Sequence, residues 1–153
     1  MDELVMGLVN ELERLRGAYD CFQPQIEDPS DEHGPMILVV PDEDSGSAPV
    51  TIHLERDDLV SITIGEAAQV ELYDKQGVMY LMGEILAWIT AVLDGDFVEV
   101  IHRRHGRVVG SRLNLVVDGV TQAVTYREGL FPLVGTQREK RHYAPCHRSN
   151  SPR

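Results

Sequence analysis

The sequence predicts an α+β fold in which antiparallel strands are covered by an N-terminal helix and a central apolar helix. Three observations lead to this prediction. The most apolar stretch of the chain, residues 77–95, has the periodicity of a helix. Short segments of alternating polarity precede it, and two-residue turns separate the segments that follow it. The 153 residues are enough for one domain with a substantial core.

Residues 3–19 are predicted to form an amphipathic helix. Its apolar stripe consists of Leu4, Leu8, Leu12, Leu15 and Tyr19. Asp2 and Glu3 lie at its start, where the helix dipole favours acidic side chains. The following residues, 20–35, are predicted to be a loop because they contain three prolines, a glycine and several acidic side chains.

A meander of three or four strands is predicted before the central helix. Three of its segments alternate apolar and polar residues, whereas the first is apolar throughout. The four segments are 36–40, 50–55, 59–64 and 69–73. Polar, turn-rich links join them, as expected for antiparallel neighbours.

The central helix contains one charged side chain, Glu84, before its end at Asp94-Gly95. One side of this helix carries the small residues Gly83, Ala87, Thr90 and Ala91. Small side chains let another backbone approach closely. We expect this side to pack against the first helix of the same chain, and the alternative is a dimer or partner contact.

Three strands joined by two-residue turns are predicted after the helix. They span residues 96–104, 107–117 and 120–127. Because a two-residue turn fixes the cross-strand partners, position 100 should face 111 and position 113 should face 124. This register places Val98 and Val100 on the apolar face, and it places Glu99 on the opposite face beside Arg112.

The domain is predicted to span residues 1–134, and the basic, aperiodic residues 135–153 are predicted to be a disordered tail. Cys21 and Cys146 lie at opposite ends of the chain, and two isolated thiols are the simpler interpretation. Whether the tail cluster of His142, Cys146 and His147 binds a metal stays open.

The net charge of −11 is unevenly distributed. Residues 1–74 carry 18 acidic and 3 basic side chains, whereas residues 75–153 carry 7 and 11. This acidity argues against nucleic acid as the main partner and permits a basic protein partner. The sequence shows no membrane-spanning segment and no secretory signal, so a cytoplasmic location is expected.

Motifs that carry chemistry are absent from the sequence. It has no nucleophile elbow, no phosphate-binding glycine loop and no zinc-ligand pattern. We therefore expect a protein-binding chain that is not an enzyme and has no cofactor and no metal. The basic hairpin tip around Arg104 and Arg107 is a second candidate contact, which would suit an acidic partner.

The small size, the acidity and the segment from Ile85 to Leu115, a helix followed by a strand, a basic turn and a strand, resemble the small acidic immunity proteins of bacterial toxin systems. This resemblance implies an inhibitor whose acidic loops cover the basic cleft of a toxin. The acidic contact residues would be Asp42, Glu43, Asp44, Asp57, Asp58 and Glu66.

Two other functions fit the same sequence. One is an adaptor or secretion-chaperone-like protein that binds through a sheet edge or the small-residue side of the central helix. The other is a small-ligand-binding or enzyme domain with a pocket between the sheet and the helices. The chain is expected to be a monomer or a homodimer in either case.

Overall fold

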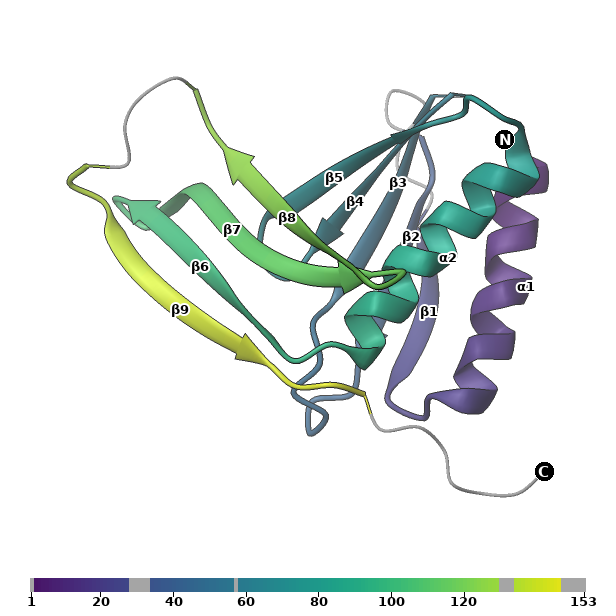
Figure 1. Cartoon of the computed structure of the whole chain (residues 1–153), viewed down its shortest axis with the longest axis horizontal. Helices are drawn as coiled ribbons and strands as arrows, with labels where there is room; N and C mark the ends of the chain where they lie inside the picture. The colour runs from purple at the N-terminus through teal and green to yellow at the C-terminus, as the bar shows by residue number, and fades with distance from the viewer. Residues whose placement is uncertain (1, 28–33, 57, 130–133, 147–153) are drawn as a thin grey trace.

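A computed structural model confirms the α+β fold and describes residues 2–27, 34–56, 58–129 and 134–146 (Figure 1). The two helices are α1 (Asp2–Ala18) and α2 (Val78–Asp94). The strands before α2 are β1 (Phe22–Glu27), β2 (Met36–Pro41), β3 (Val50–Arg56), β4 (Leu59–Ile64) and β5 (Ala68–Tyr73). Those after α2 are β6 (Phe97–Arg104), β7 (Arg107–Val117), β8 (Val120–Arg127) and β9 (Gln137–Tyr143).

The described strands form one antiparallel sheet in the order β1-β2-β3-β4-β5-β8-β7-β6-β9. The predicted meander is present as β2 to β5, and the three predicted later strands are β6 to β8. The two halves of the sheet meet at β5 and β8, whose register contains a single pair, Gln69 opposite Thr125. The sheet therefore has an N-terminal half, β1–β5, and a C-terminal half, β6–β9, with a narrow junction.

Both helices pack on the inner face of this sheet, where they lie side by side (Figure 1). α1 contacts β1, and α2 contacts both β5 and β7. Just beyond α1, the Tyr19 hydroxyl donates a hydrogen bond of 2.7 Å to Asp94 at the end of α2. The largest fully buried side chains include Leu8, Leu12, Ile52, Ile62, Leu81, Ile85 and Ile89.

The prediction of a loop over residues 20–35 is wrong for residues 22–27, which form β1. This strand pairs with β2 from Phe22 opposite Pro41 to Glu27 opposite Met36. Pro24 does not prevent the pairing, because β1 is an edge strand and one side of its backbone needs no partner. Phe22 is 1% exposed and anchors the strand to the core.

Residues 137–143 lie in β9 rather than in a disordered tail. β9 pairs with β6 along its whole length, from Phe97 opposite Tyr143 to Arg103 opposite Gln137. Its sequence, Gln-Arg-Glu-Lys-Arg-His-Tyr, lacks the apolar alternation that identifies strands. An edge strand tolerates such a polar sequence, since one side of it stays in water.

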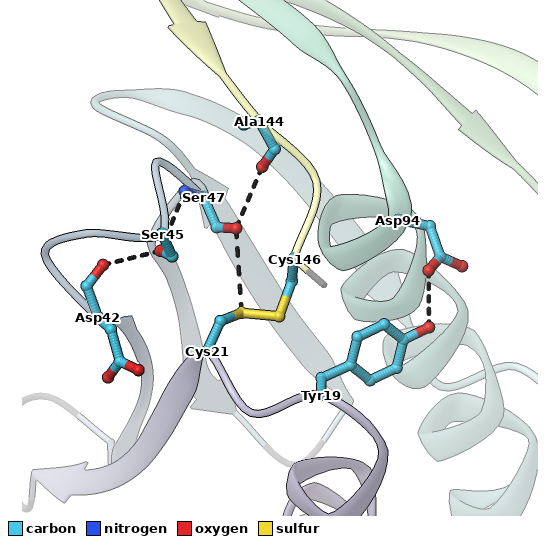
Figure 2. Close-up of a disulfide and its surroundings, with 8 residues drawn as sticks. All are labelled: Tyr19, Cys21, Asp42, Ser45, Ser47, Asp94, Ala144 and Cys146. Atoms are coloured by element: carbon cyan, nitrogen blue, oxygen red, sulfur yellow. Dashed lines mark hydrogen bonds between the residues drawn. A yellow bond between two sulfur atoms is a disulfide. The ribbon is translucent and has the colours of Figure 1, made fainter. Parts of the chain in front are cut away.

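A disulfide joins Cys21, just before β1, to Cys146, just after β9 (Figure 2). The expectation of two isolated thiols is therefore wrong. The two Cα atoms are 5.8 Å apart. Backbone hydrogen bonds hold the same segment, because Cys146 N–H donates to the Leu93 carbonyl at 2.6 Å and Ala144 N–H donates to the Gly46 carbonyl at 2.9 Å.

The two hairpins test the predicted registers. The β7–β8 register is confirmed, with Leu113 opposite Val124. The β6–β7 register differs by one residue, because a bulge follows His102 and places Val100 opposite Arg112. A slip of one residue exchanges the two faces of a strand. As a result Glu99 is buried, whereas Val98 is 42% exposed.

Removing the disulfide with the double substitution Cys21→Ser and Cys146→Ser should destabilise the fold. The bond closes a loop with a sequence separation of 125, and the chain-entropy account then predicts a loss of roughly 4–5 kcal/mol. Urea denaturation with and without reductant measures this loss, and the double variant, which should not respond to reductant, is the control. If the unmodified chain has the same urea midpoint with and without reductant, the disulfide does not contribute to stability.

Gly83→Ala should raise the free energy of unfolding by about 1 kcal/mol, because glycine is a poor residue inside a helix. A Cβ at Gly83 would meet no atom within 4 Å. Gly7 in α1 is the matched control, since a Cβ there would lie 3.0 Å from Met82 Sδ. Urea denaturation should therefore show a smaller gain for Gly7→Ala than for Gly83→Ala.

Candidate functional site

The structure separates the acidic loop residues into two groups. Asp42, Glu43 and Asp44 are exposed in the β2–β3 loop, and these three carboxylates form no ion pair with other described residues. Asp58 is exposed in the β3–β4 turn, and Asp57 lies outside the described residues. Because the β2–β3 loop and the β3–β4 turn lie at opposite ends of β3, the two groups do not share one surface.

Glu66, in the β4–β5 turn, belongs to a closed ring of four ion pairs. It contacts Arg103 at 3.0 Å and Arg141 at 2.8 Å. Glu139 completes the ring by contacting Arg103 at 3.1 Å and Arg141 at 2.9 Å. Hydrogen bonds from Arg141 and Arg103 lower the pKa of Glu139. The charge of Glu66 is therefore matched within the chain rather than offered to a partner.

The basic hairpin tip is also engaged within the chain. Arg107 forms an ion pair with Glu128. Arg104 donates a hydrogen bond of 3.3 Å to the Val134 carbonyl. Both arginines were candidate contacts for an acidic partner. The ion pair with Glu128 offsets the charge of Arg107, whereas the bond to a neutral carbonyl leaves Arg104 charged.

Beneath the ion-pair ring lies Glu99, which was predicted to lie beside Arg112 on the face opposite the apolar one. Its side chain is 0% exposed. Its carboxylate accepts hydrogen bonds from the hydroxyls of Tyr143 at 3.0 Å and Ser111 at 2.5 Å. It also accepts three from backbone N–H groups of the β4–β5 turn: Glu66 at 2.8 Å, Ala67 at 3.1 Å and Ala68 at 3.4 Å.

The β4–β5 turn forms a binding site for the Glu99 carboxylate. Successive backbone N–H groups pointing into one concavity form an anion-binding nest, and Glu99 occupies it. Gly65 has a φ of 70°, and a Cβ there would lie 2.4 Å from Glu99 Oε1. Burial raises the pKa of Tyr143, and the charge of Glu99 raises it further. This phenol therefore remains a hydrogen-bond donor to Glu99.

The chemistry of this buried cluster is structural. Its carboxylate has no open side, and the groups around it are satisfied by one another. Among the residues that the structure describes, no three His, Cys, Asp or Glu side chains are placed to hold a metal ion. In the tail cluster, Cys146 is in the disulfide and His147 lies outside the described residues.

The outer side of α2, which carries the small residues, is the second feature whose surroundings differ from the prediction. Met79 is 76% exposed and Tyr80 is 50% exposed. Gly83 faces open space rather than α1, which corrects the expected packing of this side. Next to it is an open hollow of about 390 Å³ between α2 and the β7–β8 hairpin. Its lining includes Gly83, Ala87, Thr90, Val116 and Asp118.

Two further hollows are open and mainly polar. One of about 410 Å³ lies beside the end of α1 and is lined by Glu13, Arg16, Gly17, Asp20, Phe22 and Gln23. The other, of about 180 Å³, lies between the end of β5 and the start of α2 and includes Tyr73, Lys75 and Tyr80. Neither is an apolar pocket of the kind that encloses a small ligand.

Comparison with known proteins finds no matching family model, no matching curated protein and no matching solved structure. The described residues also contain no helix long and apolar enough to cross a membrane.

Glu99→Gln should lower the free energy of unfolding by about 2–3 kcal/mol, because the amide loses the charge-assisted bonds and turns an N–H toward other donors. Glu139→Gln, an isosteric change in the half-buried ring above, is the control and should change stability less than Glu99→Gln does. Urea denaturation measures both. Equal losses for the two variants would show that the buried carboxylate has no special role.

Proposed function

We propose that this chain is a non-catalytic protein-binding module that contacts its partner through the outer side of α2. The composition of this helix is the observation that supports the proposal most directly. Glu84 and Asp94 are the only charged residues among its 17. A helix that is apolar on all sides is normally buried on all sides. Here Met79 and Tyr80 remain in solvent, so a partner would complete the burial.

The neighbouring hollow supports the same surface. It lies along the small-residue side of α2, where Gly83 and Ala87 leave room for a close approach. Val116, on the β7–β8 hairpin, forms the opposite wall and is 59% exposed. Exposed aromatic and methionine side chains beside a hollow are common features of protein interfaces.

An inhibitor or immunity protein that neutralises one partner is the most specific form of this proposal. The net charge of −11 would steer a basic partner toward the chain. Asp42, Glu43 and Asp44 are a second candidate contact for such a partner, because they are exposed and form no ion pair with any described residue. Glu66 is a weaker candidate, since Arg103 and Arg141 already neutralise it.

The two other functions make different demands on the molecule. An adaptor or secretion-chaperone-like protein would use a sheet edge or the outer side of α2 for weaker and more apolar contacts. A ligand-binding or enzyme domain would need one of the open hollows to close around a small molecule. Thermal stabilisation by a small molecule would favour that third function over both protein-binding ones.

The location of the protein is part of the proposal. The sequence favoured the cytoplasm, whereas disulfides persist mainly in oxidising surroundings and are rare in a reducing cytosol. The Cys21–Cys146 bond therefore supports a site of action where thiols become oxidised. Thiol labelling of the chain in its native cells would distinguish the two: labelled cysteines indicate the reducing cytosol.

Gly83→Arg should leave the fold intact, because a side chain at this position points into open space. The large, charged arginine side chain should abolish binding to the partner, because it would occupy the proposed contact surface. The tagged chain is used to capture its partner from native cells, and light scattering of the purified complex gives the stoichiometry. Asn10→Arg, also at an exposed helix position, is the control for added charge. A triple variant, Asp42→Asn, Glu43→Gln and Asp44→Asn, tests the acidic loop separately.

A stoichiometric partner that is lost with Gly83→Arg and kept by Asn10→Arg would support the α2 surface. Loss with the triple variant alone would place the contact on the acidic loop. Equal capture by all variants would contradict both the α2 surface and the acidic loop as the contact. No stoichiometric partner for the unmodified chain would contradict the proposal and favour a ligand-binding domain.

A further inference from the structure

We propose that the free edge of β9 binds an extended acidic peptide segment, which adds to the sheet as a further antiparallel or parallel strand. Two neighbouring features support this inference. In the described part of the chain, β9 has an edge without a strand partner, and basic side chains without ion pairs lie beside it on the outer face of the C-terminal half. Arg112, Arg138 and Lys140 of this surface do not line the hollow beside α2, so it is separate from the contact proposed above.

The alternation along β9 separates its side chains by charge and by face. Tyr143 is buried on the inner face, and Glu139 and Arg141 share that face within the ion-pair ring. Arg138 and Lys140 therefore point to the outer face and are exposed. The acidic residues of β6 to β9 are Glu99 and Glu139, and both lie on the inner side. The outer face of these four strands therefore carries no acidic side chain within the strands.

The pairing registers place the basic residues in two rows across the sheet. Lys140 faces Val100, which faces Arg112. Arg138 faces His102, which faces Gly110, which in turn faces Arg127. Strands are about 4.8 Å apart, so Lys140 and Arg112 are separated by roughly 10 Å.

Three of these cations are available to a partner. Arg112, Arg138 and Lys140 form no ion pair with the described residues. The cations elsewhere in the C-terminal half differ, since Arg103, Arg107 and Arg141 all contact carboxylates of the chain. A chain with a net charge of −11 thus keeps a local positive surface.

The edge itself supplies the second requirement. Among the described strands, β9 pairs with β6 alone, which leaves one row of its N–H and C=O groups without a strand partner. An added strand would use these groups for main-chain hydrogen bonds. Carboxylates at every second position of that strand would lie on the outer face beside Arg138 and Lys140. This spacing selects an extended acidic peptide over a neutral one.

Other anionic partners fit this face less well. The outward side chains of β6 to β9 include no Phe, Tyr or Trp on which a nucleic-acid base could stack. Valines are interleaved with the cations, and Val98 is 42% exposed. A mixture of apolar and cationic side chains suits a polypeptide with both acidic and apolar residues.

The test measures binding of an eight-residue peptide of alternating Thr and Glu to the full chain by fluorescence anisotropy at low and physiological salt. Two peptides of the same composition are controls: one with the order Thr-Thr-Glu-Glu repeated, and one N-methylated at alternate residues. We expect the alternating peptide to bind roughly tenfold more tightly than either control, with affinity falling as salt rises.

Charge reversal locates the surface. Arg138→Glu with Lys140→Glu should weaken binding by about tenfold or more. Arg14→Glu with Arg16→Glu makes the same change in net charge on α1 and should leave binding nearly unchanged apart from a small long-range effect. Gly83→Arg should also bind the peptide normally, so a failure of this inference is distinguishable from a failure of the α2 contact. Circular dichroism confirms that each variant is folded.

Three results would overturn the inference. Equal affinity for the alternating and reordered peptides would show nonspecific charge attraction without strand addition. Full binding of the N-methylated peptide would exclude main-chain pairing. Tighter binding of oligothymidylate or of vesicles containing phosphatidylserine, lost with the same Arg138 and Lys140 substitutions, would assign the face to nucleic acid or to a membrane instead.

Discussion

The buried carboxylate of Glu99 is the interaction on which the rest of the structure depends. Glu99 belongs to the C-terminal half of the sheet, whereas the N–H groups of residues 66–68 belong to the N-terminal half. Because β5 and β8 share a single register pair, strand pairing alone joins these halves weakly. Burying a charge is costly unless hydrogen bonds compensate, and five such bonds reach this carboxylate. The two halves are thereby held as one curved sheet.

Curvature of the sheet determines which surfaces remain for partners. The inner face closes around the core and the buried side of α2, so Met79, Tyr80 and Gly83 on the opposite side of α2 stay exposed. On β9, Tyr143 contacts Glu99 and the disulfide fixes the following segment. This strand is consequently held at the edge with Arg138 and Lys140 facing outward. Two potential contact surfaces thus follow from one curved sheet.

Elements whose signals lie in neighbouring residues could be predicted from the sequence. Leucine spacing located α1, and the Asp118-Gly119 turn fixed the β7–β8 register. The features that were missed depend on contacts distant in sequence. No residue type in the sequence indicates the bulge after His102. Without the bulge, the register places Glu99 on the face opposite the apolar one. β9 and the disulfide were missed because a polar edge strand carries no apolar alternation and because cysteine spacing does not reveal pairing. Asp42, Glu43, Asp44, Asp58 and Glu66 lie in loops as predicted, but their separation and the neutralisation of Glu66 required the topology.

Amide hydrogen exchange at Glu66, Ala67 and Ala68 tests the role of Glu99 most directly. These three amides belong to a turn, yet each donates to the buried carboxylate. Under native conditions they should exchange as slowly as the amides of β4, and the Glu99→Gln variant should lose this protection selectively. Exchange in the unmodified chain as fast as at the exposed His105-Gly106 turn would contradict the account, because the two halves of the sheet would then lack their connection through Glu99.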